Sequence, residues 1–379
     1  MNQIPMLDLH AEYEYMKPAI DNAIQTCLKH QMWILGPEVK ALEGALATYL
    51  GVKHCIGVSS GTEALVLSLR AQAIVRKDRE YFERGDLVIT TPFTFTATGD
   101  AILRSGATPV FVDIDPVTYN LDPAGIRSCI KEHGAKVVGI VPVHLYGQSC
   151  DMDAIMNIAT EHKLFVLEDV AQAFGAAWRG TKLGAVGTLG AFSFFPSKNL
   201  GGFGDGGMIS TNDDDLAAMA RMLLKHGGRD KYNVDHIGYN ARLDTLQAAV
   251  LLAKLTYIDE FNDRRRGIAE KYLAGLQGTP GLVLPQTAAN AHHVFHQFTI
   301  ASARRDDLQK HLTGQGVSSM LYYPFPLHKM KVFEGRSLVH QGVPKAEAAC
   351  AQVLSLPVEP LQNAEDTGRV VAAVKGFAR

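Results

Sequence analysis

The chain has 379 residues, of which 47% are hydrophobic and 20% are charged, and its formal net charge is −2 at pH 7. This length exceeds one typical domain and predicts two domains with sizeable cores. The near-neutral charge argues against a nucleic-acid partner, because the one basic block, residues 264–266, is expected to form a solvated helix face. No apolar run reaches about 18 residues, so no membrane span is expected.

The cysteines and the N-terminal segment bear on the compartment. The five cysteines are scattered, and none belongs to a Cys-x-x-Cys pair. This pattern favours reduced thiols over a disulfide framework or a zinc site, so we expect no metal. Residues 1–9 lack a basic start followed by a long apolar core, so we expect no signal peptide and a cytoplasmic protein.

The first half of the chain predicts alternating helices and strands. Apolar residues have helical spacing over residues 21–50, with a break at Gly36-Pro37. Strands are expected at residues 54–58, 87–90, 109–112, 137–142, 164–167 and 208–210, and helices at residues 62–70, 97–104 and 152–162. Such alternation implies a mostly parallel α/β sheet covered by helices on both faces. The charged residues 75–85 are expected to form a surface excursion.

The pattern changes beyond about residue 250. A long charged helix is expected at residues 255–276, a strand at 293–300, and further helices at 305–314 and 365–377. We therefore predict a large domain over residues 1–250 and a smaller α+β domain over residues 251–379.

Asp169 and Lys198 form the most informative pair of residues. Asp169 ends an apolar run, and Lys198 follows among aromatic, small and glycine residues. A pyridoxal phosphate enzyme needs such a pair, because a lysine forms a Schiff base with the cofactor and a carboxylate keeps its pyridine nitrogen protonated. Burial beside a positive centre can lower the pKa of a lysine by several units from about 10.4. Taken singly, such residues are usually structural or solvated, so the hypothesis depends on the pair.

A phosphate group would need its own site, and residues 59–65 offer one. Ser59-Ser60-Gly61-Thr62 follows an expected strand and opens an expected helix, where backbone N–H groups and the helix dipole can face a dianion. An ordinary capped helix explains the same residues, since Ser, Thr and Gly are common at helix starts. The glycines of residues 201–207 do not form a dinucleotide fingerprint, and no P-loop motif occurs, which disfavours a Rossmann oxidoreductase and a nucleotide hydrolase.

Together these segments resemble the DegT-type sugar aminotransferases over nearly the whole chain. Members of that family are fold-type-I pyridoxal phosphate enzymes that aminate keto groups of nucleotide-linked sugars. The resemblance runs through residues 34–39, 59–65, 91–95, 110–115, 142–147, 168–172, 193–207 and 238–244. The last two segments are its most specific parts, whereas residues 75–85 depart from the family pattern.

The resemblance implies a role for each matched residue. Lys198 resembles the Schiff-base lysine, and Asp169 resembles the partner of the pyridinium nitrogen. The further cofactor contacts that it implies are Gln172 at the ring hydroxyl, Gly61, Thr62 and Ser193 at the phosphate, Phe95 stacked on the ring, and Asn240 at the phosphate of a neighbouring subunit. It therefore also implies a homodimer with shared active sites.

Substrate contacts are expected at Arg242, Tyr322 and His328. Arg242 could fork onto carboxylate or phosphate oxygens, although a salt bridge with Asp244 explains it equally well. Residues 31–39 and 322–328 resemble family members that aminate C3 of a 3-keto sugar, such as UDP-2-acetamido-2-deoxy-3-keto-glucuronate in O-antigen synthesis.

The implied reaction is a transamination from L-glutamate, through pyridoxamine phosphate, to a nucleotide keto-sugar used in a surface polysaccharide. Nothing in the residues distinguishes a UDP-sugar from a dTDP-sugar. The alternatives are amination at C4, a pyridoxamine-dependent sugar dehydratase and a non-catalytic regulatory protein that kept the fold. The dehydratases have histidine where this chain has Lys198, which disfavours them.

Overall fold

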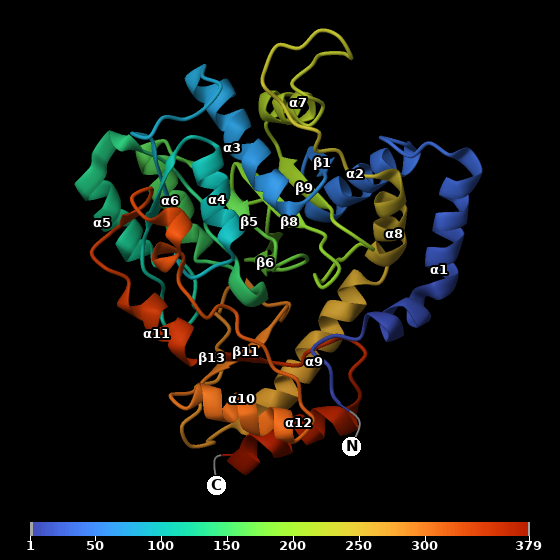
Figure 1. Ribbon diagram of the computed structural model, residues 1–379, viewed down its shortest axis with the longest axis vertical. Coiled ribbons are helices and arrows are strands. Elements are labelled where there is room, and N and C mark those ends of the chain that lie inside the picture. The colour runs from blue at the N-terminus through green and yellow to red at the C-terminus, as the bar shows by residue number, and fades with distance from the viewer. Residues whose placement is uncertain (1–2, 378–379) are drawn as a thin grey trace.

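The computed structural model describes residues 3–377, and its largest element within them is an eight-stranded sheet (Figure 1). In spatial order its strands are β1 (His54–Val58), β9 (Gly207–Thr211), β8 (Leu189–Ser193), β5 (Phe165–Asp169), β4 (Val137–Ile140), β2 (Leu87–Thr90), β3 (Thr108–Phe111) and β12 (Leu338–Val339). Neighbours from β8 to β12 pair in parallel, whereas β9 is antiparallel to β8 and β1. The predicted mostly parallel sheet is confirmed.

Helices cover both faces of the large sheet, as Figure 1 shows. The helices whose apolar residues share one core are α3 (Gly61–Lys77), α4 (Thr96–Arg104) and α7 (Asp214–Leu223). Those of the other core are α2 (Pro37–Leu50), α5 (Pro123–His133), α6 (Met152–His162) and α8 (Thr245–Leu255), with α1 (Leu9–His30) packed outside α8. Burial on both faces explains why the parallel strands read as continuous apolar runs.

The segment after α8 builds most of the lower part of Figure 1. Its elements are α9 (Ile258–Leu276), β11 (Phe298–Ala301), α10 (Arg305–Gly314), β13 (Val353–Leu356) and α12 (Ala364–Phe377). β11 pairs antiparallel with β13, and the three helices share a separate core with these strands that includes Tyr272 and Phe298.

Part of the C-terminal segment returns to the large sheet. β12 pairs in parallel with β3 at the sheet edge, with Leu338 opposite Val110. α8 (Thr245–Leu255) runs through residue 250, so no helix or strand ends there. The domain boundary expected at that residue stays a prediction. The remaining elements are β6 (Ala177–Trp178), β7 (Thr181–Lys182), β10 (Ala291–His292), α11 (Pro344–Gln352) and the short 3-10 helices η1 (Gly134–Lys136), η2 (Leu145–Gly147), η3 (Leu327–Lys329) and η4 (Lys331–Phe333).

Three local expectations differ from the structure. The strand expected at residues 293–300 begins only at Phe298, because Phe295 has a φ of 43°, outside the β region. Residues 75–85 are not a simple surface excursion, since α3 continues to Lys77 and the side chain of Phe82 is buried. Arg265 does not lie on a solvated face, because it is 5% exposed and donates a 2.6 Å hydrogen bond to the Val358 carbonyl oxygen.

Two features bear on the earlier expectations about thiols and membranes. All five cysteines are free and buried. Across residues 3–377, no helix combines the length and the apolar character that crossing a bilayer requires.

Candidate active site

Asp169 ends β5 at the carboxyl edge of the central sheet, where ligands bind in open α/β sheets. The residue is 4% exposed. Its Oδ2 accepts a 2.8 Å hydrogen bond from Thr98 Oγ1, and its Oδ1 accepts a 3.1 Å hydrogen bond from the Ala171 N–H. Burial raises the pKa of Asp169, while these two hydrogen bonds and the charges of Lys198 and His144 oppose the rise. A cation placed against such a buried carboxylate would stabilise its charged form.

The preceding carboxylate, Glu168, faces the opposite side of the strand, because side chains alternate along β5. It is fully buried, and its Oε2 lies 3.0 Å from His144 Nε2. Its oxygens also accept hydrogen bonds of 3.0, 2.9 and 2.7 Å from the backbone N–H groups of Gly184, Val186 and Gly187. Glu168 therefore anchors the surrounding loop, and Asp169 is the carboxylate of this pair that is left for a ligand.

Lys198 lies in the loop after β8, the strand that neighbours β5. Its backbone N–H donates a 2.8 Å hydrogen bond to the Phe195 carbonyl oxygen, which closes a tight turn. Burial lowers the pKa of the half-buried Lys198 to about 8, against the opposing attraction of Asp169. The two residues that the sequence paired therefore lie within electrostatic reach of each other.

The residue after the lysine ties this loop to the C-terminal segment. Asn199 is buried, its Oδ1 lies 2.9 Å from His296 Nδ1, and its Nδ2 donates a 2.7 Å hydrogen bond to Asn262 Oδ1. Burial holds the pKa of His296 well below its usual value, and the charges of Lys198 and Arg265 lower it further. A neutral imidazole thus lies near the lysine, at a residue that the sequence did not single out.

Gln172 connects the large sheet to residues 322–323. Its Nε2 donates a 2.7 Å hydrogen bond to Tyr323 Oη, and its Oε1 accepts a 2.9 Å hydrogen bond from the Tyr146 N–H. Tyr146 Oη in turn donates to the Tyr322 carbonyl oxygen. Burial, followed by the nearby charge of Asp169, raises the pKa of Tyr323, so its hydroxyl stays neutral. The predicted Gln172 therefore lies in one polar network with the predicted Tyr322.

The predicted phosphate ligands lie together at the end of β8. α3 begins at Gly61, with the Ser60 side chain as its N-cap. A Cβ atom at Gly61 would come within 2.6 Å of Ser193 Cβ, so only glycine lets the helix start approach the strand end so closely. The first backbone N–H groups of a helix have no partner within it, so those of the first turn at Gly61 and Thr62 can face an anion beside Ser193.

Phe95 presents an aromatic surface at the start of α4. The residue is 56% exposed, and its ring centroid lies 6.1 Å from that of Tyr323. A flat ligand could stack on a ring exposed in this way.

Asn240 and Arg242 stand apart from the network around Asp169 and Gln172. Asn240 is exposed, and its Oδ1 accepts a hydrogen bond from Arg242 Nη2. Both roles expected for Arg242, an anion contact and a salt bridge with Asp244, stay predictions. Its guanidinium group donates through Nη2 to Asn240, which places these two predicted residues in contact.

His328 lies in η3, next to Leu327, whose N–H donates a 2.9 Å hydrogen bond to the Pro92 carbonyl oxygen. His328 Nε2 lies 3.0 Å from Glu347 Oε1. Its Nδ1 is buried and has no hydrogen-bond partner among residues 3–377. Pro92 belongs to the loop that leads to Phe95. The segment that carries His328 and its unpaired Nδ1 is therefore hydrogen-bonded to that loop.

This geometry belongs to a chain that matches, over residues 14–375, the family described as the DegT/DnrJ/EryC1/StrS aminotransferase family. The chain is a member of that family. The fold and the resemblance found in the sequence are therefore confirmed, and the protein is an aminotransferase.

Relatives match this family member over almost their whole length. The pleiotropic regulatory protein of Geobacillus stearothermophilus is 44% identical over 99% of both chains. The UDP-N-acetyl-3-dehydro-alpha-D-glucosamine 3-aminotransferase of Acidithiobacillus ferrooxidans is 43% identical, over 98% of this chain and 97% of its own. Among solved structures, DesV of S. venezuelae has a TM-score of 0.94 and 40% identity, over 100% of this chain and 99% of its own.

Aminotransferases of this family use pyridoxal phosphate, and the site fits that cofactor. Asp169 offers a buried carboxylate whose pKa is raised by burial, and Lys198 offers an amine whose pKa is lowered to about 8. Gly61 and Ser193 form a cradle that a side chain at residue 61 would fill. When bound, the cofactor supplies an aldehyde that takes up amino groups and a ring that withdraws electrons from the substrate carbon.

Proposed function

We propose that this aminotransferase transfers an amino group to a keto group, at C3, of a nucleotide-linked sugar. The observation that carries this proposal is the pair formed by the buried Asp169 and the half-buried Lys198, in a chain 43% identical over almost its full length to a nucleotide-sugar 3-aminotransferase. The protein's chemistry, size and family all agree with a biosynthetic enzyme. We place this enzyme in the cytoplasm and assign it to the synthesis of a surface polysaccharide.

In this proposal Asp169 holds the proton on the cofactor's ring nitrogen, because its charged form gains most from a cation in the buried site. Thr98 orients the Asp169 carboxylate through the 2.8 Å hydrogen bond to Oδ2. Gln172 faces the ring hydroxyl, and Phe95 covers one face of the ring.

Lys198 both attaches the cofactor and moves the proton of the substrate Cα. A pKa of about 8 suits this second task, because a base whose pKa lies near the operating pH can both accept and return a proton. The hydrogen bonds of Asn199 to His296 and Asn262 hold the lysine loop in position. Gly61, Thr62 and Ser193 bind the phosphate that keeps the cofactor in place.

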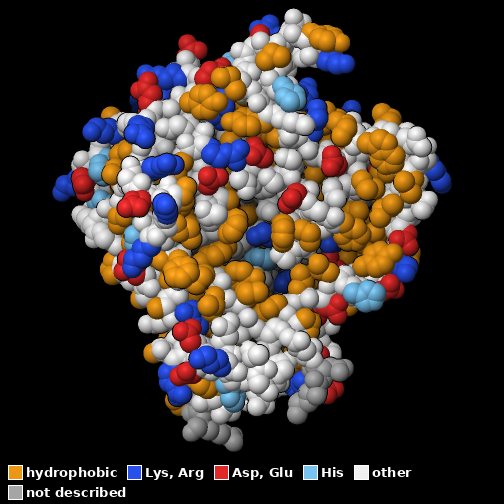
Figure 2. Space-filling view, in the orientation of Figure 1, with side chains coloured by type: hydrophobic (Ala, Val, Ile, Leu, Met, Phe, Trp, Pro, Cys, Tyr) orange, Lys and Arg blue, Asp and Glu red, His pale blue; other side chains and the backbone are white. Residues whose placement is uncertain are grey.

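The active form is a homodimer with shared active sites, in which Asn240 reaches the phosphate bound by the partner. Exposed apolar side chains support this assembly, since Met32, Trp33, Ile34 and Leu35 are each 43–55% exposed. Ile34 pairs with Asp244, so this apolar segment lies beside the segment that carries Asn240. Figure 2 shows hydrophobic side chains gathered over α1 and α8, next to this region.

L-Glutamate is the proposed amino donor, and Arg242, Tyr322 and His328 are the proposed substrate contacts. The experiment is a screen of UDP- and dTDP-linked 3-keto and 4-keto sugars with glutamate, read by product mass. Formation of a 3-amino sugar with loss of glutamate supports the proposal. Amination of the 4-keto sugars alone, or no amination of any keto-sugar by holoenzyme that still consumes glutamate, overturns it.

A non-catalytic regulatory role is the second candidate, because one close relative is named a pleiotropic regulatory protein. That name describes no chemistry, whereas the buried Asp169, the Lys198 amine and the Gly61–Ser193 cradle are all intact here. Release of 2-oxoglutarate from glutamate by the holoenzyme separates the two roles, since a regulator without turnover would release none.

A further inference from the structure

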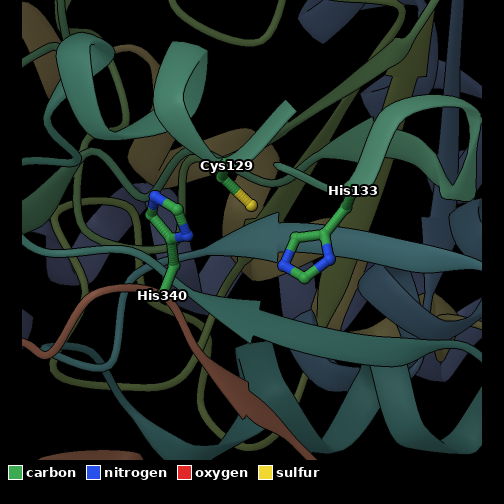
Figure 3. Close-up of side chains that lie close together, drawn as sticks. All are labelled: Cys129, His133 and His340. Carbon is green, nitrogen blue, oxygen red and sulfur yellow. The ribbon is translucent and has the colours of Figure 1, made fainter. Parts of the chain in front are cut away.

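Three metal-ligating side chains converge at the far edge of the large sheet, near β12. Cys129 and His133 lie on α5, four residues apart and therefore on one face of the helix. His340 follows β12, and its N–H donates a 2.9 Å hydrogen bond to the Phe111 carbonyl oxygen of β3. The Cys129 sulfur and one nitrogen of each histidine lie within 4.8 Å of one another. In the view of Figure 3 the sulfur lies between the two imidazole rings.

His340 is the unusual member of this cluster. It is 5% exposed, yet neither of its ring nitrogens has a hydrogen-bond partner among residues 3–377. The carboxylate of Glu132 lies 3.1 Å from His340 Nδ1, but without the geometry of a hydrogen bond. An imidazole buried with both nitrogens unsatisfied is costly, and a bound metal ion would satisfy one of them.

The second Cys–His cluster of the chain serves as a contrast. Cys27, His30 and Glu38 also come within 4.8 Å of one another. There, however, His30 Nε2 lies 2.9 Å from Glu38 Oε1, and His30 Nδ1 accepts a 3.0 Å hydrogen bond from the Met32 N–H. Both imidazole nitrogens are occupied, so that cluster explains itself without an ion.

We infer that Cys129, His133 and His340 form a structural zinc site. Thiolate and imidazole ligands in this combination suit zinc, whereas magnesium and calcium prefer oxygen ligands. Around a tetrahedral zinc, with Zn–N and Zn–S bonds of about 2.0 and 2.3 Å, two nitrogen ligands lie about 3.3 Å apart and a nitrogen and a sulfur ligand about 3.5 Å apart. The three ligand atoms, which lie within 4.8 Å of one another, would have to move closer together, and His133 has room to move because its side chain is 20% exposed. Glu132, whose carboxylate lies 3.1 Å from His340 Nδ1, would supply the fourth protein ligand that a structural site requires.

A metal ion at this site would link parts of the chain that are distant in sequence. α5 packs against the large sheet, whereas His340 follows β12, the strand by which the C-terminal segment joins that sheet. β12 is only two residues long and contributes few ladder hydrogen bonds, so a metal ion there adds a second attachment.

The test uses full-length holoenzyme prepared without a histidine tag or chelator and exposed to zinc chloride. After gel filtration we expect about one zinc per chain by mass spectrometry of the metal content, and a thermal midpoint that falls when a chelator removes the metal. Cys129→Ser, His340→Asn and His133→Asn should each lower the zinc content at least tenfold. Cys27→Ser and His30→Asn, in the contrasting cluster, should leave it unchanged.

A second measurement keeps the inference testable if the His340 variant does not fold. Cadmium bound by a thiolate gives a near-ultraviolet charge-transfer band, which should appear in the wild type and in Cys27→Ser and be absent in Cys129→Ser. The visible absorbance of bound cofactor should be the same in all folded variants, since the proposed zinc site lies outside the site of Lys198. Zinc below about 0.1 per wild-type chain, or equal zinc in the wild type and in both the Cys129 and His133 variants, overturns the inference.

Discussion

Thr98 Oγ1 donates a 2.8 Å hydrogen bond to Asp169 Oδ2, and this contact joins the start of α4 to the end of β5. A hydrogen bond to a charged group contributes about 1.5–3 kcal/mol. Thr98→Val keeps the shape of the side chain and removes the donor, so we expect turnover to fall about tenfold or more, with the fold intact. Steady-state kinetics of the variant measure this effect.

Thr94→Val is the matched control for that substitution. Thr94 Oγ1 lies 3.1 Å from Thr98 Oγ1 and is buried as well, but its hydroxyl is not bonded to Asp169. Its replacement should therefore cost less activity than that of Thr98. Equal losses in the two variants would show that packing, rather than the carboxylate contact, matters.

Asp169→Asn should keep the fold and lose most of the activity. The neutral amide cannot stabilise a protonated ring nitrogen, and removing such a preorganised charge typically costs on the order of 100- to 1,000-fold in turnover. The variant should still bind cofactor, because the phosphate cradle is unchanged. Asp151→Asn, at the exposed N-cap of α6, is the control. Near wild-type turnover of Asp169→Asn would mean that another carboxylate serves the ring.

Lys198 should be the lysine that holds the cofactor covalently. Sodium borohydride should bleach the visible absorbance of the holoenzyme and leave a stable label, which peptide mapping should place on Lys198. Lys198→Ala should abolish both the label and turnover while still binding pyridoxamine phosphate. Lys310→Ala, at an exposed position of α10, should retain the label. A label that persists in Lys198→Ala would refute the assignment.

The lowered pKa of Lys198 predicts the pH dependence of cofactor incorporation into the apoenzyme. Only the neutral amine attacks an aldehyde, and the pKa of about 8 means that its neutral fraction rises about tenfold per pH unit below pH 8 and levels off above. Asp169 raises this pKa, so Asp169→Asn should move the midpoint to lower pH. Stopped-flow absorbance measures the rate, and a midpoint near that of a free lysine, about 10.4, would contradict the prediction.

Complementation should reveal the shared active site. If Asn240 serves the partner's phosphate, Lys198→Ala and Asn240→Ala damage different halves of one site. A heterodimer of the two variants then has one site with both defects and one with neither, so it should have up to about half of the wild-type activity per dimer. A randomly exchanged equimolar mixture, in which about half of the dimers are heterodimers, should reach about a quarter. Mixtures that stay inactive after verified subunit exchange, or a fully active monomer by light scattering, would exclude this arrangement.

Local patterns predicted the parts of the site that lie at the ends of strands and helices. Asp169 follows an apolar strand, and Gly61 opens a helix, so each has a signature within a few residues. Thr98 and His296 have none, because they contact Asp169 and Asn199 across 71 and 97 residues. Contacts at such separations depend on the order of the strands in the sheet, which a single sequence does not reveal.

The errors in the fold have a similar origin. The polar composition of residues 264–266 predicted a solvated face, but Arg265 is buried against a carbonyl oxygen of a distant segment. The alternating residues 293–300 predicted one strand, but a left-handed conformation at Phe295 interrupts it before β11. Tertiary contacts override local propensity at both places.

The amide groups that hold Glu168 have a consequence for how β5 finds its alignment. The strand pairs with β8 so that Glu168 lies opposite Gly190 and Asp169 opposite Ala191. A slip by one residue would exchange the two acids, because neighbouring side chains face opposite sides of a sheet. The shorter aspartate would then fail to reach the three N–H groups, which would be left buried and unsatisfied. The three N–H groups thus favour the alignment in which Glu168 faces them and Asp169 faces the opposite side of the sheet.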